Sequence, residues 1–151
     1  MATIEKSIET LNDLIEINND RVAGFEKAIA DINNENVDLK ELFQEYATQS
    51  RRFSQELTAM VAADGGDAET GTSAAGSAHR VWIDVKSLFG NSDREGILNE
   101  AERGEDAIKK AYRDALGDGE LTSDAYSTVS NQASDIYAAH DRIKALRDAS
   151  R

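Results

Sequence analysis

The sequence predicts an all-α fold, a bundle of four long helices, and three observations support this prediction. The 151 residues include no proline, the residue that most often ends or kinks a helix. In four long segments, apolar residues recur at alternating steps of three and four, the spacing of a helix with one buried face. The length suits one domain with its own core. We therefore expect residues 1–151 to form a single helical bundle.

The first two segments, residues 3–32 and 36–63, are expected to form an antiparallel hairpin because only a few residues separate them. Thr3 can cap the first helix. One polar residue interrupts each apolar pattern, Asn18 in the first segment and Ser50 in the second. The hairpin geometry puts these two interruptions at one height. The residues expected to face inward are Ile4, Ile8, Leu11, Ile15, Val22, Phe25, Ile29 and Ile32, then Leu39, Phe43, Tyr46, Phe53, Leu57 and Met60.

The second half of the chain predicts another hairpin. Ser92 and Glu95 have the spacing of a capping box, which predicts a helix over residues 92–116. Glycines then mark a tight turn that ends at Gly119, and the last helix is expected to reach about residue 149. Its inward residues are expected to be Tyr126, Val129, Ala133, Ile136, Ile143 and Leu146.

A connection of nearly thirty residues joins the two hairpins. Residues 64–77, DGGDAETGTSAAGS, are rich in glycine and serine and predict a flexible loop. Residues 78–89, AHRVWIDVKSLF, predict a short helix. A connection of this length can cross the whole bundle and make the second and third long helices parallel. This is the one-crossover topology of ferritin-like bundles, and we expect it here.

Four stretches carry a resemblance to a known family: ETLNDLIEINNDRVAGFEKAI, LFQEYATQSRRFSQEL, GSAHRVWIDVK and LNEAERGEDAIKKAYRDAL. In their order and spacing they resemble a bacterial family of ferritin-like four-helix-bundle proteins known as a domain of unknown function. The resemblance covers residues from about 8 to 120. It implies the fold and a bacterial, cytoplasmic origin, and it implies no activity, substrate or catalytic residue.

The amino-acid composition limits the classes of partner that we expect the protein to bind. Seventeen basic residues against twenty-nine acidic ones give a net charge of −12, which disfavours binding to nucleic acid or to anionic membranes. The N-terminal residues are amphipathic rather than apolar, and no apolar stretch approaches the roughly 20 residues that span a bilayer. There is no cysteine for a disulfide or a thiolate metal site. We therefore expect a cytoplasmic protein.

Glu105 violates the apolar pattern of its segment, because it falls in the middle of the buried face. Counting from each turn places it near Asn18 and Ser50, with Gln49 and Glu102 close by. The sequence therefore predicts a polar layer at mid-height. In one hypothesis this layer is hydrogen-bonded and sets the register of the long apolar faces. A positively charged partner for Glu105 would come from Arg21, Arg51 or Arg52.

The alternative hypothesis is a metal site in this layer, built from hard oxygen ligands. Its candidate ligands are Glu105, Glu102, Asp20 and Asp135. Ferritin-like carboxylate sites also use two Glu-x-x-His motifs, and this chain has none. The sequence therefore requires no cofactor, and the alternative is iron, manganese or another divalent metal.

Two further predictions concern the histidines and the function. His79, Trp82 and Lys86 share one face of the short helix and are candidates for a small-ligand pocket, although a tryptophan in this position is more often part of the core. For His140 we expect a solvated or capping role. No nucleophile with an adjacent base is visible, so hydrolase chemistry has no candidate. We expect a non-enzymatic structural or interaction protein, acting through a protein partner or self-association in a stress or storage setting; the alternative is a metal-binding protein.

Overall fold

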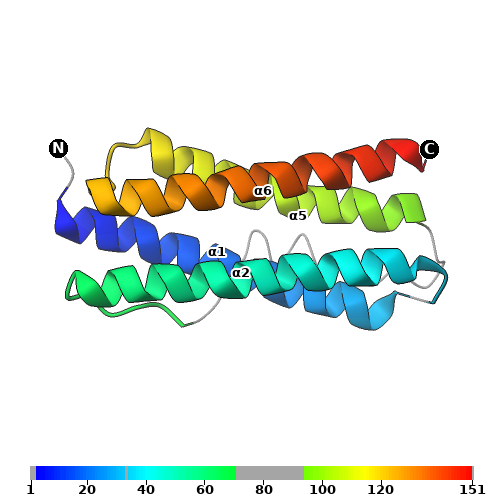
Figure 1. Cartoon of the computed structure of the whole chain (residues 1–151), viewed down its shortest axis with the longest axis horizontal. Coiled ribbons are helices and arrows are strands. Elements are labelled where there is room, and N and C mark those ends of the chain that lie inside the picture. The colour runs from blue at the N-terminus through cyan, green and yellow to red at the C-terminus, as the bar shows by residue number, and fades with distance from the viewer. Residues whose placement is uncertain (1–2, 33, 71–93, 151) are drawn as a thin grey trace.

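The computed structural model describes residues 3–32, 34–70 and 94–150, and these ranges are all-α, with no strand. Its elements are α1 (Ile4–Asp31), the short 3₁₀ helix η1 (Asn34–Asn36), α2 (Val37–Ala63), α5 (Arg94–Gly117) and α6 (Ser123–Ala149). Figure 1 shows the four long helices side by side. They confirm the predicted four-helix, all-α class. The predicted helix at 78–89 and the capping residue Ser92 lie outside the described residues.

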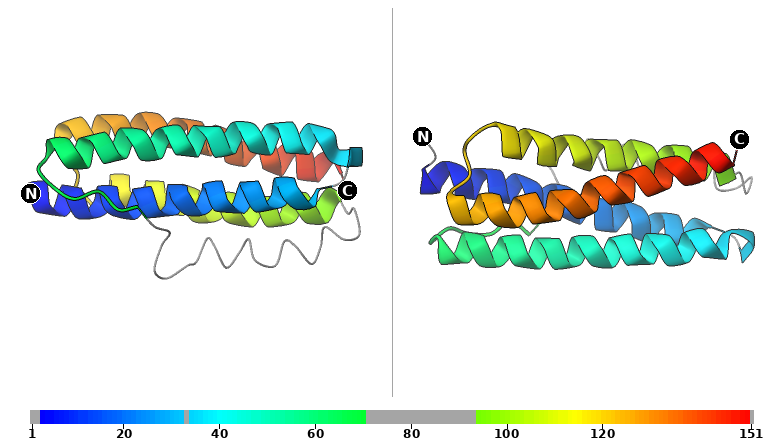
Figure 2. Two further views of the ribbon diagram at one scale, coloured as in Figure 1. Left: turned by 90° about the horizontal axis from the view of Figure 1, so that it is seen from below. Right: turned by 45° about the horizontal axis from the view of Figure 1, so that its top comes forward.

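The four helices form two antiparallel hairpins, α1 with α2 and α5 with α6 (Figure 1). Figure 2 shows α1 beside α5 in one layer and α2 beside α6 in the other. α2 and α5 begin at the same end of the bundle, where Arg94 donates to Asp38 over 2.7 Å. These two helices therefore run in the same direction.

Local chemistry explains where the helices begin and end. The Thr3 hydroxyl accepts from the Lys6 backbone N–H at 3.1 Å and caps α1, as its position predicted. After α2 the chain turns through Gly65, whose φ of +84° suits a residue without Cβ. Residues 64–70 are not helical, but they are attached to α1, because the Asn12 side chain bonds the backbone of Asp67 and Glu69.

The core consists of two hydrophobic clusters. One lies toward the α1–α2 turn around Phe25, Phe43 and Ile143, and the other lies toward the α5–α6 turn around Leu11, Leu57 and Val129. Most of the predicted inward residues belong to them. Three do not: Ile4 is 55% exposed, Tyr126 is 47% exposed, and Val22 is half-buried. Ile4 and Tyr126 both stand in the first turn of a helix.

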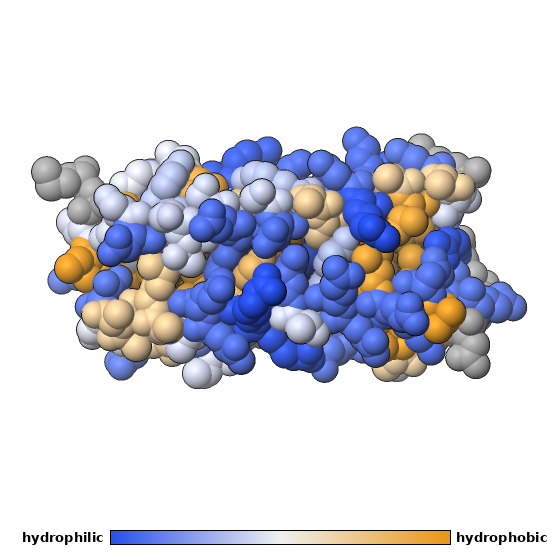
Figure 3. All heavy atoms as spheres, in the orientation of Figure 1, coloured by the Kyte–Doolittle hydropathy of each residue, from blue (hydrophilic) through white to orange (hydrophobic). Residues whose placement is uncertain are grey.

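The surface is mostly hydrophilic, in keeping with the acidic composition. On the face shown in Figure 3, hydrophilic residues cover the middle of the bundle and hydrophobic residues gather toward its ends. None of the described helices is long and apolar enough to span a bilayer.

Candidate functional site

A buried ion pair joins Arg21 of α1 to Glu105 of α5. The guanidinium Nε donates to Glu105 Oε1 at 2.7 Å, and Nη2 donates to Oε2 at 2.8 Å. The two side chains are only 2% and 0% exposed. Such a bidentate pair satisfies both carboxylate oxygens and places opposite charges together out of water. The odd carboxylate in the α5 pattern is therefore paired by an arginine of α1.

The remaining nitrogen of Arg21 extends the contact to α2. Its Nη1 donates to Gln49 Oε1 at 2.8 Å and to Ser50 Oγ at 3.0 Å. Ser50 in turn donates to Asn18 Oδ1 at 2.9 Å. The two interruptions of the first hairpin are thus hydrogen-bonded to each other and, through Arg21, to Glu105.

A second branch reaches α6. Asn18 Nδ2 donates to the hydroxyl of Tyr112 at 2.8 Å, and that hydroxyl donates to Gln132 Oε1 at 2.7 Å. Gln132 Nε2 then donates to Glu56 Oε1 at 2.9 Å. All four long helices therefore contribute to one polar layer, which we define as Asn18, Arg21, Gln49, Ser50, Glu105, Tyr112 and Gln132.

The electrostatics of the polar layer favour structure over proton chemistry. Burial raises the pKa of Tyr112 well above its usual value, so its phenol stays protonated at neutral pH. Burial, together with the negative charge of Glu105, raises the pKa of Tyr46 to about 12. The Arg21 guanidinium lies 5.4 Å from the ring centre of Phe25 and 5.2 Å from that of Tyr46. Aromatic rings thus enclose the cation next to its carboxylate partner.

Glu102 and Asp135, which were also expected at this level, lie outside the polar layer. Glu102 pairs with Arg147 of α6 rather than with the polar layer. Asp20 is fully buried, whereas the Asp135 side chain is 54% exposed, with one oxygen 3.9 Å from Arg52. The pocket expected at His79, Trp82 and Lys86 lies outside the described residues.

A second cluster lies between α5 and α6 and contains Glu102, Asp106 and His140. One ligand atom from each lies within 4.8 Å of the other two. His140 Nε2 lies 2.5 Å from Asp106 Oδ1, and its Nδ1 lies 3.1 Å from Asp141 Oδ1. The imidazole is therefore held between two carboxylates, with a third, Glu102, close by.

Burial and charge around this cluster are uneven. Glu102 and His140 are only 9% and 7% exposed, whereas the Asp106 side chain is 59% exposed. The hydrogen bond from His140 holds the pKa of Asp141 below its usual range. Arg147 donates to Glu102 and also to Asp148 Oδ1, at 3.0 Å. The cluster is thus open to solvent on the Asp106 side and has one compensating arginine.

The cluster corrects our expectation for His140, which is neither solvated nor a helix cap. The sequence gives only a weak indication of this cluster. Glu102 and Asp106 are four apart on one helix and so share a face. Nothing in the sequence says which residue of α6 stands opposite, because the pairing of α5 with α6 sets the register.

The family model described as Domain of unknown function (DUF2383) matches residues 6–118. The chain belongs to this family. The match includes the α1, α2 and α5 parts of the polar layer, together with Glu102 and Asp106 of the second cluster. DUF2383 ends before α6, so His140 and Gln132 lie beyond the matched region. No curated protein matches the chain.

Proposed function

We propose that this DUF2383 protein is a non-enzymatic, ferritin-like bundle that binds one divalent transition-metal ion through Glu102, Asp106 and His140. The observation that supports the proposal is the approach of three ligand atoms from two helices to within 4.8 Å of one another. The parallel course of α2 and α5 supports the ferritin-like topology, because a short loop could not produce it. A bacterial, cytoplasmic setting is also part of the proposal, and it rests on the sequence resemblance alone.

The donor set indicates the kind of metal. One imidazole with two carboxylates suits zinc, manganese or ferrous iron, whereas calcium and magnesium prefer oxygen ligands alone. Two ligands of one tetrahedral zinc ion lie about 3.4 Å apart, given bonds of about 2.1 Å. Side chains already within 4.8 Å need only small rotations to reach that spacing. Three protein ligands would leave one position for water.

The neighbours of His140 would prepare it for metal binding. When Nδ1 donates to Asp141, the other nitrogen, Nε2, points toward Asp106. A carboxylate that holds the distal N–H of a metal-bound imidazole is the usual second partner in such sites. The metal would take the place of the proton shared by Nε2 and Asp106, so binding should release a proton and weaken as the pH falls.

Arg147 would have to leave Glu102 when the metal binds. The guanidinium has a second partner in Asp148, so it need not lose every ion pair on release. Metal binding would replace the single positive charge of Arg147 beside Glu102 with the two positive charges of the metal ion. The site therefore favours a divalent ion over a monovalent one.

The experiment is a titration of chelator-stripped protein with zinc, manganese and ferrous iron, followed by calorimetry and by elemental analysis. We expect one equivalent of metal, with affinity falling at least about tenfold in His140→Gln. His79→Gln is the matched control, since it removes the only other histidine. If His140→Gln and Asp106→Asn both retain one equivalent at unchanged affinity, the proposed site is wrong.

The second candidate function is self-association or protein contact in a stress or storage setting. The observation that favours it is the exposure of Ile4 and Tyr126, which stand in the first turns of two helices that begin at one end of the bundle. Contiguous exposed apolar patches mark contact surfaces, and we propose that this end of the bundle carries one. Mass measurement by light scattering over a range of concentrations tests this. A monomer throughout would exclude self-association.

A further inference from the structure

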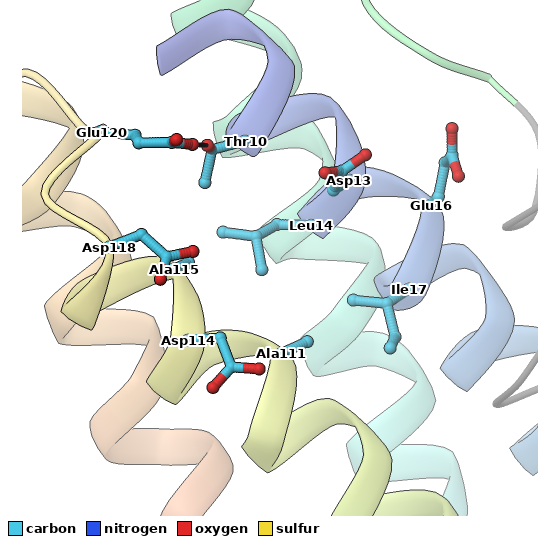
Figure 4. A pocket seen from close by; sticks show the side chains of 10 residues that line it. All are labelled: Thr10, Asp13, Leu14, Glu16, Ile17, Ala111, Asp114, Ala115, Asp118 and Glu120. Atoms are coloured by element: carbon cyan, nitrogen blue, oxygen red, sulfur yellow. Dashed lines mark hydrogen bonds between the residues drawn. The ribbon is translucent and has the colours of Figure 1, made fainter. Parts of the chain in front are cut away.

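A groove of about 410 Å³ runs between α1 and α5, close to the α5–α6 turn. Figure 4 shows its lining side chains, which come from both helices and from the turn. The volume lies within the range of small-molecule sites. The groove is separate from the polar layer and from the cluster of Glu102, Asp106 and His140, since it shares no residue with either. Its described lining residues are Thr10, Asp13, Leu14, Glu16, Ile17, Ala111, Asp114, Ala115, Asp118 and Glu120.

The floor of the groove is apolar. Leu14 and Ile17 contribute from α1, and Ala111 and Ala115 contribute from α5. The two alanines are four residues apart and therefore lie one above the other on the same face of the helix. Because their side chains are small, they leave a trough along α5 into which aliphatic groups of a ligand can fit.

Carboxylates line both sides of this floor. Asp13 and Glu16 stand on α1, Asp114 stands on α5, and Asp118 and Glu120 follow α5 in the turn at the end of the groove. Among the residues that the structure describes, the lining includes no lysine or arginine. Asp13 and Glu16 are three residues apart on α1, roughly 4.5 Å along the helix axis. The groove thus has two rows of negative charge beside a strip of hydrocarbon.

The carboxylates of the groove repel one another around Asp13. Burial, reinforced by the carboxylates of Glu9 and Glu120, raises the pKa of Asp13. Thr10 donates to Glu120 at 3.2 Å, and Lys110 pairs with Asp114 at 2.7 Å from outside the groove. A positively charged ligand would relieve the repulsion that remains around Asp13.

We propose that this groove binds a linear aliphatic polyamine of the spermidine class. Such a molecule carries ammonium groups separated by three or four methylenes, a separation comparable to one helical turn. Its methylenes can lie on the alanine floor while its ammonium groups pair with the carboxylates on either side. A compact metal ion would use the charge but not the apolar floor.

The test is calorimetric titration of the full chain with spermidine at physiological salt, where diffuse charge attraction is screened. We expect saturable binding with one equivalent, weakened at least about tenfold in the double variant Asp13→Asn/Asp118→Asn. The matched control is Glu41→Gln/Glu45→Gln, which removes the same charge from a shallow groove between α2 and α6. Equal loss in both double variants would show diffuse attraction and overturn the proposal.

A second arm tests the apolar floor. Hexaamminecobalt(III) has the charge of spermidine but no methylenes, so we expect it to bind at least about tenfold more weakly. Ala111→Leu, which fills the trough without changing charge, should weaken spermidine binding and leave unfolding by heat cooperative. Cobalt complex binding as tight as spermidine, or a lysine-rich peptide that binds tighter than spermidine, would overturn the assignment to a polyamine.

Discussion

Replacing Glu105 with leucine should strongly destabilise the bundle, although the new side chain is apolar and of similar size. The substitution leaves the Arg21 guanidinium, 2% exposed, without its counterion and removes two charge-assisted hydrogen bonds of 2.7 and 2.8 Å. Breaking a buried ion pair by removing one partner costs about 3–5 kcal/mol. For a domain of this size, that loss corresponds to a fall in Tm of about 6–20 °C.

The pairing makes a further prediction about Arg21→Met. That variant alone should lose a similar amount, because Glu105 is then buried without a cation. The double variant Arg21→Met/Glu105→Leu removes both charges, so its loss should be smaller than the sum of the single losses by about 3 kcal/mol or more. Ser50 and Gln49 still lose their shared donor, and the double variant is therefore not expected to exceed the wild type.

Urea unfolding followed by circular dichroism measures these free energies. The control is Glu26→Leu, which breaks the exposed pair between Glu26 and Arg51, with side chains 55% and 48% exposed; we expect a loss below about 1 kcal/mol. The structural role of Glu105 would be refuted by a loss in Glu105→Leu no larger than in this control, or by additive losses in the double variant. Because the proposed metal site is elsewhere, Glu105→Leu should also keep its full metal equivalent.

Three further predictions concern single groups. Tyr112→Phe should cost about 1–2 kcal/mol in urea unfolding, since it leaves two buried hydrogen-bond partners unmatched. Gly65→Ala should lower the free energy of unfolding by about 1 kcal/mol, because φ is +84° at this position. Gly117→Ala should raise it by about 0.5–1 kcal/mol, because Gly117 is helical and has open space for a methyl group. Equal effects of the two substitutions would contradict this reasoning. The hydrogen bond from Arg94 lowers the pKa of Asp38 in the folded protein. The ion pair therefore contributes its full stability above the unfolded-state pKa of about 3.9. This contribution is lost as the pH falls through the lower pKa of the folded state. With Asp38 59% exposed, its worth is below about 1 kcal/mol, and wild type and Asp38→Asn should converge in Tm near pH 2.

The helices themselves were predictable because their causes are local. Spacing of apolar residues, the absence of proline and the Thr3 cap all act within a few residues of sequence, and the bounds of α1 and α2 agree with prediction to within one residue. The turn between them also puts Asn18 and Ser50 at one height, so counting along the chain was enough to expect their proximity.

Partner choice across helices was not predictable, because it depends on rotation and register between elements far apart in the sequence. In the sequence, Arg21, Arg51 and Arg52 were equally good partners for Glu105. In the structure the Arg21 guanidinium lies in the polar layer and pairs with Glu105, whereas Arg51 pairs with Glu26 at the surface. Glu102 was expected beside Glu105 because the two residues are three apart on one helix and therefore share a face. In the structure, the Glu102 side chain instead lies toward α6 and pairs with Arg147.

The sequence by itself therefore determined an all-α bundle of four long helices and the presence of polar residues within its apolar faces. Only the tertiary structure decided what those residues do. It paired Glu105 with Arg21, brought His140 to Glu102 and Asp106, and set carboxylates of α1 and α5 around a common groove. The physical reason is that helix periodicity is encoded locally, whereas a contact between two helices depends on how both pack against the rest of the core.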